Sequence, residues 1–356
     1  AGEHAGLKEE SLMTKREAVL DALAHRPVEP VPYHIDFTGQ EGDKIAAYLG
    51  DPDFRQKLGN YLSCAYYSGD SLPVPGRPGY FRDEFGVVWN RNGADKDIGV
   101  IENPIFTEPD LSLYKFPEPD REKLHALFRG LEERQTDGFK IAMFGFSLFE
   151  RAWTLCGMEN LLVYMVSDPE FVEGLFEEIT NWNMQVLDIA LQYQFDAFHF
   201  GDDWGQQRGL IMGPRYWRRY IAPCLKKMYG RVRDAGRFIS QHSCGDIYEV
   251  FPDLIDMGLN IYQTFQPEIY DAEKVKREYG QDLTFWGGIS TQAILPHGTP
   301  DEVRAETRRM IRIMNQNGGY IAAPTHSVPG DVPPENILAM LEVFSEGKIT
   351  AASWGR

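Results

Sequence analysis

The sequence predicts an α/β protein built as a (β/α)8 TIM-type barrel with an N-terminal elaboration over the barrel mouth. The chain of 356 residues is long enough for one such barrel or for two ordinary domains. From residue 121 onward, short apolar runs alternate with segments of helical periodicity, which is typical of a parallel sheet with helical crossovers. An open doubly wound sheet is the alternative, but no predicted strand is followed by the Gly-x-Gly-x-x-Gly pattern of a dinucleotide site.

The first part of the chain supplies a helix, a strand and the elaboration. Residues 14–25 begin with a capping Thr14 and carry apolar residues at helical spacing, so we predict a helix. Prolines end this helix, and residues 31–37 are then predicted to form the first strand. Residues 38–120 are rich in Gly, Pro and aromatic residues, and we expect them to form an elaboration or lid over the mouth. Within them, Asp83–Trp89 is the clearest candidate for a short strand or hairpin.

The second part of the chain repeats one unit, a helix followed by a strand. The predicted helices are residues 121–134, 158–165, 168–193, 214–235, 247–257, 271–279, 300–317 and 335–345. The predicted strands are residues 140–146, 195–203, 238–242, 260–265, 283–289 and 320–324. Together with the first strand and one strand from residues 60–90, they give about the eight strands of a closed barrel.

Composition and charge exclude several classes of function. The formal net charge of -17 disfavours nucleic acid as a partner, because the phosphates would be repelled. No apolar run approaches the roughly 18 residues that a membrane helix needs, and the polar start is unlike a signal peptide. We therefore expect a cytoplasmic protein with no membrane contact, organised as a tail (1–13) and a single domain (14–356).

The segment Phe238–Gly245 ends in two side chains that can bind a metal. His242 and Cys244 are two residues apart, so both leave the same face of an extended strand. In a parallel barrel, active sites lie at the carboxyl ends of the strands, where this pair would stand. On spacing alone, however, core packing with a hydrogen-bonded histidine is more common than a metal site.

Several motifs, in order along the chain, resemble the uroporphyrinogen decarboxylase superfamily, which also contains cobalamin-dependent methyltransferases. The resemblance spans Thr14 to Phe344, and its strongest motifs are Asp202-Asp203-Trp204-Gly205, His242-x-Cys244-Gly245, Trp286-Gly287-Gly288-Ile289-Ser290, and Gly319-Tyr320-Ile321 through Pro334-x-Asn336. The resemblance implies a (β/α)8 barrel with its site at the carboxyl ends of the strands, and a homodimer.

The resemblance also separates two activities. Decarboxylases of the superfamily carry an Arg-Gln-Ala-Gly-Arg segment after the first strand, which neutralises the carboxylates of a porphyrinogen. The corresponding stretch here, residues 36–40, contains no arginine, so a porphyrinogen is not the expected substrate. In the methyltransferase branch, a His-x-Cys pair and a later Cys hold zinc. The resemblance therefore implies that His242, Cys244 and His326, which stands at the later Cys position, hold Zn²⁺.

From this resemblance we expect a zinc-dependent methyltransferase. It would move a methyl group between a small methylated substrate or acceptor and a corrinoid. The corrinoid would arrive on a partner protein, since the chain has no cobalamin-binding Asp-x-His-x-x-Gly segment. The predicted catalytic residues are Asp202, Asp203 and His326, and the predicted substrate-binding residues are Asp36, Glu150, Trp204 and Trp286.

Other readings of these residues stay open. The alternative activity is a metal-free lyase or decarboxylase acting on a small carboxylated molecule, with His326 and one aspartate carrying protons. Asp202 and Asp203 could instead cap a helix or loop, and because adjacent strand residues face opposite ways, only one is expected to reach the pocket. A closed, structural zinc site would need a fourth ligand, for which Glu150, Asp202 and Asp203 are the candidates.

Overall fold

A curled sheet of seven parallel strands forms the centre of the computed structural model, which describes residues 13–67, 69, 71–93 and 99–355. The predicted tail covers residues 1–13, and residues 1–12 lie outside the described part of the chain. The strand order is β1-β6-β7-β10-β11-β12-β13. These strands are β1 (Leu62–Tyr67), β6 (Phe139–Phe144), β7 (Ala197–Gly201), β10 (Phe238–His242), β11 (Ile261–Phe265), β12 (Thr284–Ile289) and β13 (Tyr320–Pro324). The α/β class and the parallel sheet are thereby confirmed.

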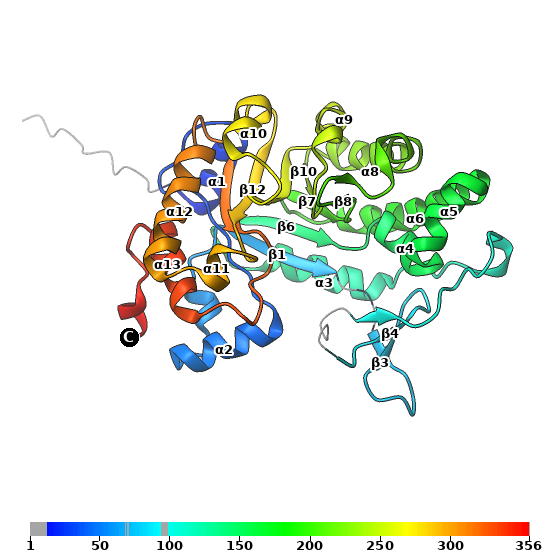
Figure 1. Ribbon diagram of the computed structural model, residues 1–356, viewed down its shortest axis with the longest axis horizontal. Helices are drawn as coiled ribbons and strands as arrows, with labels where there is room; N and C mark the ends of the chain where they lie inside the picture. Colours follow the sequence, from blue (N-terminus) through cyan, green and yellow to red (C-terminus); the bar gives the residue numbers. More distant parts are fainter. Residues whose placement is uncertain (1–12, 68, 70, 94–98, 356) are drawn as a thin grey trace, which may run out of the picture.

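Helices follow the strands in the chain and cover the outside of the sheet (Figure 1). They are α1 (Lys15–Leu23), α2 (Gly39–Leu49), α3 (Arg121–Glu133), α4 (Phe149–Cys156), α5 (Met158–Ser167), α6 (Pro169–Ala190), α7 (Gly213–Tyr216), α8 (Ala222–Asp234), α9 (Phe251–Asp256), α10 (Ala272–Tyr279), α11 (Ile294–His297), α12 (Pro300–Met314) and α13 (Pro334–Phe344). Short helical turns are η1 (Phe54–Lys57), η2 (Leu111–Leu113), η3 (Trp217–Ile221), η4 (Tyr248–Val250) and η5 (Ala351–Trp354). Among the described helices, none combines the length and the apolar composition that crossing a bilayer requires.

The predicted first strand, residues 31–37, is not a strand in the structure. It forms two isolated bridges, Tyr33 with Ala322 and Phe37 with Val328, so it runs beside β13 without a continuous ladder. Proline at positions 30 and 32 removes two backbone donors, which interrupts the hydrogen-bonding pattern. The central sheet of the described residues therefore has seven strands, and an irregular segment occupies the place of the expected eighth.

The region between residues 38 and 120 contributes both to the central sheet and to a separate one. The strand expected between residues 60 and 90 is β1, which pairs with β6. The predicted short strand or hairpin at Asp83–Trp89 is the β3–β4 hairpin. It belongs to a small antiparallel sheet of β2 (Ser71–Pro73), β3 (Tyr80–Asp83), β4 (Val88–Asn90) and β5 (Val100–Ile101), which projects from the body of the molecule (Figure 1).

Mostly apolar side chains line the inner face of the curled sheet below the carboxyl ends of its strands. A compact cluster of buried side chains fills it: Leu62, Phe139, Ile141, Ala197, Ile261, Trp286, Ile321 and Ala323. A much larger core lies between the sheet and the surrounding helices. Because apolar side chains occupy the lower part of the interior, polar side chains are left to gather at the carboxyl ends.

Candidate metal centre

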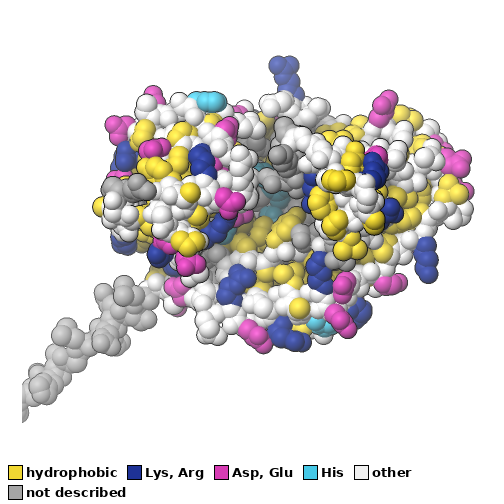
Figure 2. Space-filling model, turned by 90° about the horizontal axis from the view of Figure 1, so that it is seen from below, with side chains coloured by type: hydrophobic (Ala, Val, Ile, Leu, Met, Phe, Trp, Pro, Cys, Tyr) yellow, Lys and Arg dark blue, Asp and Glu magenta, His cyan; other side chains and the backbone are white. Residues whose placement is uncertain are grey.

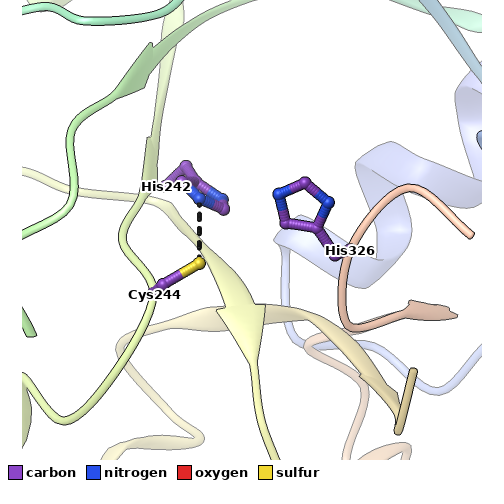
Figure 3. A group of neighbouring side chains, drawn as sticks. All are labelled: His242, Cys244 and His326. Carbon is purple, nitrogen blue, oxygen red and sulfur yellow. Dashed lines mark hydrogen bonds between the residues drawn. The ribbon is translucent and has the colours of Figure 1, made fainter. Parts of the chain in front are cut away.

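The three predicted zinc ligands lie together at the carboxyl end of the sheet. His242 is the last residue of β10, Cys244 follows it in the next turn, and His326 stands just after β13. Figure 3 shows His326 facing the other two side chains from the opposite side of the site. The ligand atoms of all three lie within 4.8 Å of one another, and among the described residues this is the group of His, Cys, Asp and Glu side chains that could hold a metal ion.

The donor set fits a zinc ion. A tetrahedral zinc, with Zn–N near 2.0–2.1 Å and Zn–S near 2.3 Å, separates a nitrogen from a sulfur ligand by roughly 3.6 Å. Cys244 Sγ lies 3.5 Å from His242 Nε2, so this pair already has the required spacing. The third candidate ligand, His326, is an exposed residue after β13, and its ring nitrogen lies within 4.8 Å of the other two ligand atoms. The imidazoles and the thiol are also donor types that zinc prefers.

The turn that carries Cys244 packs backbone against backbone on the turn after β7. Gly245 has a φ of +75°, and a Cβ there would lie 2.3 Å from the carbonyl carbon of Gly205. A Cβ at Gly205 would in turn lie 2.5 Å from the carbonyl carbon of Gly245. Glycine is therefore required at both positions, and the pair brings the turn after β7 into contact with the turn after β10.

Hydrogen bonds from β11 and the segment after it hold the ligand-bearing turn. Gln263 Oε1 accepts from His242 Nδ1, and Gln266 Oε1 accepts from the backbone N–H of Gly245 at 2.8 Å. The hydroxyl groups of Tyr262 and Tyr270 donate to the carbonyl oxygens of Ser243 (3.0 Å) and Gly245 (2.8 Å). These hydrogen bonds fix the conformation of the turn that carries Cys244.

Asp203 contacts the ligand group directly. Its Oδ1 accepts from the backbone N–H of Cys244 at 2.8 Å and lies 3.2 Å from His242 Nε2. Burial would raise the pKa of Asp203, but the hydrogen bond and the charge of His242 outweigh it and lower the pKa to about 2. For His242, burial lowers the pKa, yet Cys244 and Asp203 together raise it well above its ordinary value. Asp203 therefore keeps negative charge beside the ligands.

Asp202 lies below the site and holds a helix end. It is fully buried, and its carboxylate accepts from the backbone N–H groups of Leu148 (3.2 Å), Phe149 (2.9 Å) and Glu150 (2.8 Å), at the start of α4. Burial raises the pKa of Asp202 to about 6, although these hydrogen bonds lower it. Of the two adjacent aspartates, only Asp203 contacts the ligand group.

The two predicted substrate-binding tryptophans are both buried. Trp204 is fully buried, donates its indole N–H to Asp202 and packs edge-on against Trp217, with 5.4 Å between the ring centroids. Trp286 is part of the inner cluster beneath the metal ligands, where its ring meets His34 and His199 edge-on, at 5.7 Å in each case. The structure thus places Trp204 in the outer core and Trp286 inside the curled sheet.

Glu150 and Asp36 border the site. Burial, followed by the charges of Asp203 and Asp202, raises the pKa of Glu150 well above its ordinary value, so this carboxyl group favours its protonated form. Its neighbour Arg151 pairs with Asp83 at 2.9 Å, which ties α4 to β3. Asp36 is exposed and accepts from the hydroxyl group of Ser327 at 3.2 Å, next to His326.

Two features of the site were absent from the sequence prediction. Gln263 and Gln266 were not singled out, although Gln263 is a polar residue within the largely buried strand Ile261–Phe265. That strand pairs with β10 so that Gln263 stands opposite His242. A polar side chain on the inner face of a buried strand is the signal that could have found it. Figure 2 shows one face of the molecular surface, where histidine side chains are visible in a hollow between two lobes.

Comparisons with known proteins bear on the family and the fold of this chain. A family model described as uroporphyrinogen decarboxylase (URO-D) matches residues 92–347. A uroporphyrinogen decarboxylase of Geobacter sulfurreducens is 21% identical over 266 residues, which cover 68% of this chain and 71% of the relative. A methylcobamide:CoM methyltransferase of Methanosarcina barkeri is 20% identical over 345 residues, which cover 94% of this chain and 99% of the relative. A solved structure of a methyltransferase from Methanosarcina mazei has the same fold, with a TM-score of 0.67 at 16% identity, and the match covers 94% of this chain and 99% of that one.

Proposed function

The chain belongs to the uroporphyrinogen decarboxylase family, and within it we propose a zinc-dependent methyltransferase that moves a methyl group between a small methylated substrate or acceptor and a corrinoid carried by a partner protein. The observation that carries this proposal is the grouping of His242, Cys244 and His326 within 4.8 Å. The nearly full-length similarity to a methylcobamide:CoM methyltransferase supports the corrinoid as the methyl carrier.

With His242, Cys244 and His326 as its protein ligands, the proposed zinc would keep a fourth position for another group. Catalytic zinc sites typically combine three protein ligands with one position for water or substrate. When bound, zinc supplies a Lewis acid that polarises an oxygen or activates a thiol that enters this position. A set with one thiolate leaves more positive charge at the metal than a set with two, and this favours an ether or alcohol oxygen as well as a thiol.

The surrounding residues would serve the substrate. Asp203 offers a hydrogen-bond acceptor beside the ligands, and Glu150, whose pKa burial raises, offers a donor when it carries a proton. Asp36 would contact the substrate from the side of the His326 loop. We propose that the corrinoid partner docks at the carboxyl end of the sheet, where the three candidate ligands lie together.

The same proposal extends to the fold. We propose that residues 31–37 complete a (β/α)8 barrel in spite of their irregular bonding, because their backbone is bonded on both sides: His34 N–H donates to Ala322 at 3.0 Å and Tyr61 N–H donates to Tyr33 at 2.9 Å. We further propose one domain over residues 14–356, a lid within residues 38–120, and a homodimer.

Zinc analysis of purified protein tests the proposed function. Protein prepared without chelator should contain close to one equivalent of zinc, and Cys244→Ala should lose it. Cys224→Ala is the matched control, because Cys224 is a half-buried thiol whose Sγ contacts the carbonyl oxygen of Tyr220 at 3.3 Å within the neighbouring helices. Absence of zinc from the wild-type protein, or undiminished zinc in Cys244→Ala, would contradict the proposal.

A second candidate is a metal-free lyase or decarboxylase acting on a small carboxylated molecule. The similarity to a uroporphyrinogen decarboxylase and the raised pKa of Glu150 favour it, because a protonated carboxyl group can deliver a proton to a carbanion. This activity would survive removal of metal by a chelator, whereas methyl transfer from methylcobalamin to a thiol or alcohol would be lost.

A further inference from the structure

The side chain of Gln263 holds His242 from behind. His242 and Gln263 stand opposite each other in the register of β10 and β11. Gln263 Oε1 accepts a hydrogen bond from His242 Nδ1. The other ring nitrogen, Nε2, points the opposite way, toward Cys244 Sγ at 3.5 Å and Asp203 Oδ1 at 3.2 Å. The imidazole therefore has one nitrogen on the side of the metal ligands and one on the side of the glutamine.

A neutral histidine can bind a metal through Nε2 only if its proton is on Nδ1. An acceptor at Nδ1 stabilises this tautomer, and a partner that fixes the ring also spares the metal the cost of ordering it. Within the described part of the chain, Gln263 is the residue that supplies this acceptor. We propose that Gln263 is the positioning residue of the metal centre, selecting the His242 tautomer whose Nε2 lone pair faces the metal; this rests on the proposed zinc site.

The chemical class of this partner has a further effect. Metal-bound histidines often donate to a carboxylate, whose negative charge makes the imidazole a stronger electron donor. An amide oxygen is neutral, so Gln263 fixes the ring without adding charge. The single thiolate, from Cys244, and the neutral amide of Gln263 therefore have the same effect: each leaves the bound metal more electrophilic.

Zinc affinity, measured by competition with a chromophoric chelator at fixed pH, tests this role in the full-length protein. Gln263→Ala removes the acceptor, and we expect its affinity for zinc to fall roughly 10- to 100-fold. Gln263→Glu keeps an oxygen acceptor at nearly the same place and should bind zinc at least as tightly as the wild-type protein. The matched control is Thr264→Ala, which trims the buried neighbour of Gln263 in β11 and removes no hydrogen bond to the ligand-bearing turn; its affinity should stay within a few-fold.

A second measurement reads the tautomer itself. In zinc-loaded protein with ¹⁵N-labelled histidine, the nitrogen shifts of His242 should show a protonated Nδ1 in the wild-type protein and in Gln263→Glu. In Gln263→Ala, this Nδ1 proton should exchange faster with solvent. Near-ultraviolet circular dichroism of the metal-free variants checks that each is folded.

Three results decide between the hypotheses. Wild-type affinity in Gln263→Ala would overturn the positioning role. Equal losses in Gln263→Ala and Thr264→Ala, without recovery in Gln263→Glu, would overturn it as well, because general loosening of β11 would then explain both. Failure of the wild-type protein to bind zinc would contradict the proposed function itself, and these outcomes are therefore distinguishable.

Discussion

Two adjacent aspartates in this chain have different tasks because consecutive side chains leave the backbone on different sides. Asp203 reaches the candidate metal ligands, while Asp202 is buried at the first turn of α4 and accepts from backbone N–H groups there. Alternation along an extended segment predicted that one of the two would reach the pocket, but not which one. The choice depends on the position of α4, which a local sequence pattern does not contain.

Asp202→Ala should destabilise the protein without touching a metal ligand. The change leaves three backbone donors of Leu148, Phe149 and Glu150 without their acceptor, and buried unpaired donors cost about 1–3 kcal/mol each when they find no water. We expect the free energy of unfolding to fall by about 3 kcal/mol in Asp202→Ala and by about half as much in Asp202→Asn, which keeps one oxygen. Urea unfolding in the presence of a chelator measures both, and a loss below about 1 kcal/mol in Asp202→Ala would contradict the capping role.

The candidate ligand set shows which site residues a local sequence pattern can identify and which it cannot. The spacing of His242 and Cys244 was sufficient to predict a shared face, because it depends on two neighbouring positions of one strand. His326 stands more than eighty residues later, and only the family resemblance linked it to the pair. Gln263 was missed because a lone glutamine carries no motif, and its role follows from the register between two strands.

At the scale of elements, the contact between two turns fixes the site. The turn after β7 and the turn after β10 meet at Gly205 and Gly245, where neither residue has space for a Cβ. The predicted first strand failed elsewhere in the sheet, beside β13, because backbone partners decide whether an extended segment becomes part of a ladder. Prolines at 30 and 32 limit those partners for residues 31–37.

Gly245→Ala should be strongly destabilising and should also weaken zinc binding. The new Cβ would lie 2.3 Å from the carbonyl carbon of Gly205, so one backbone segment must move. Gly209→Ala is the matched control: its φ is also positive, at +95°, but nothing lies within 4 Å of the added Cβ. Conformational strain alone costs roughly 1–2 kcal/mol at such a position. We expect thermal unfolding of metal-free protein to show a clearly larger loss in Gly245→Ala, and equal losses in both variants would show that the close contact is unimportant.

At the scale of the whole molecule, the two ends of the sheet have different chemistry. Polar side chains gather at the carboxyl ends, whereas a buried lysine, Lys276 of α10, lies near the opposite end, beside the turn before β13. Its ammonium group donates to the carbonyl oxygen of Gly318, in the turn before β13. Burial lowers the pKa of Lys276 to about 8.

Lys276 should make stability rise with pH in the alkaline range. Its pKa falls from 10.5 in the unfolded chain to about 8 in the folded one, so between these values the unfolded state binds more protons. The folded state is then favoured as the pH rises, by about 2 kcal/mol between pH 8 and pH 10. Urea unfolding at the two pH values should show this gain in the wild-type protein and not in Lys276→Met. An identical pH dependence in both proteins would count against the burial of the charge.

The glycine contact also limits how such a centre can be built in another protein. A design that transplants His242, Cys244 and His326 into a different barrel would fail if either turn carried a side chain at the position of Gly205 or Gly245. Restoring one glycine alone would bring no benefit, because the remaining Cβ would still keep the two backbones apart. The two positions therefore form a coupled pair, and a library that varies them separately would miss the solution that requires both.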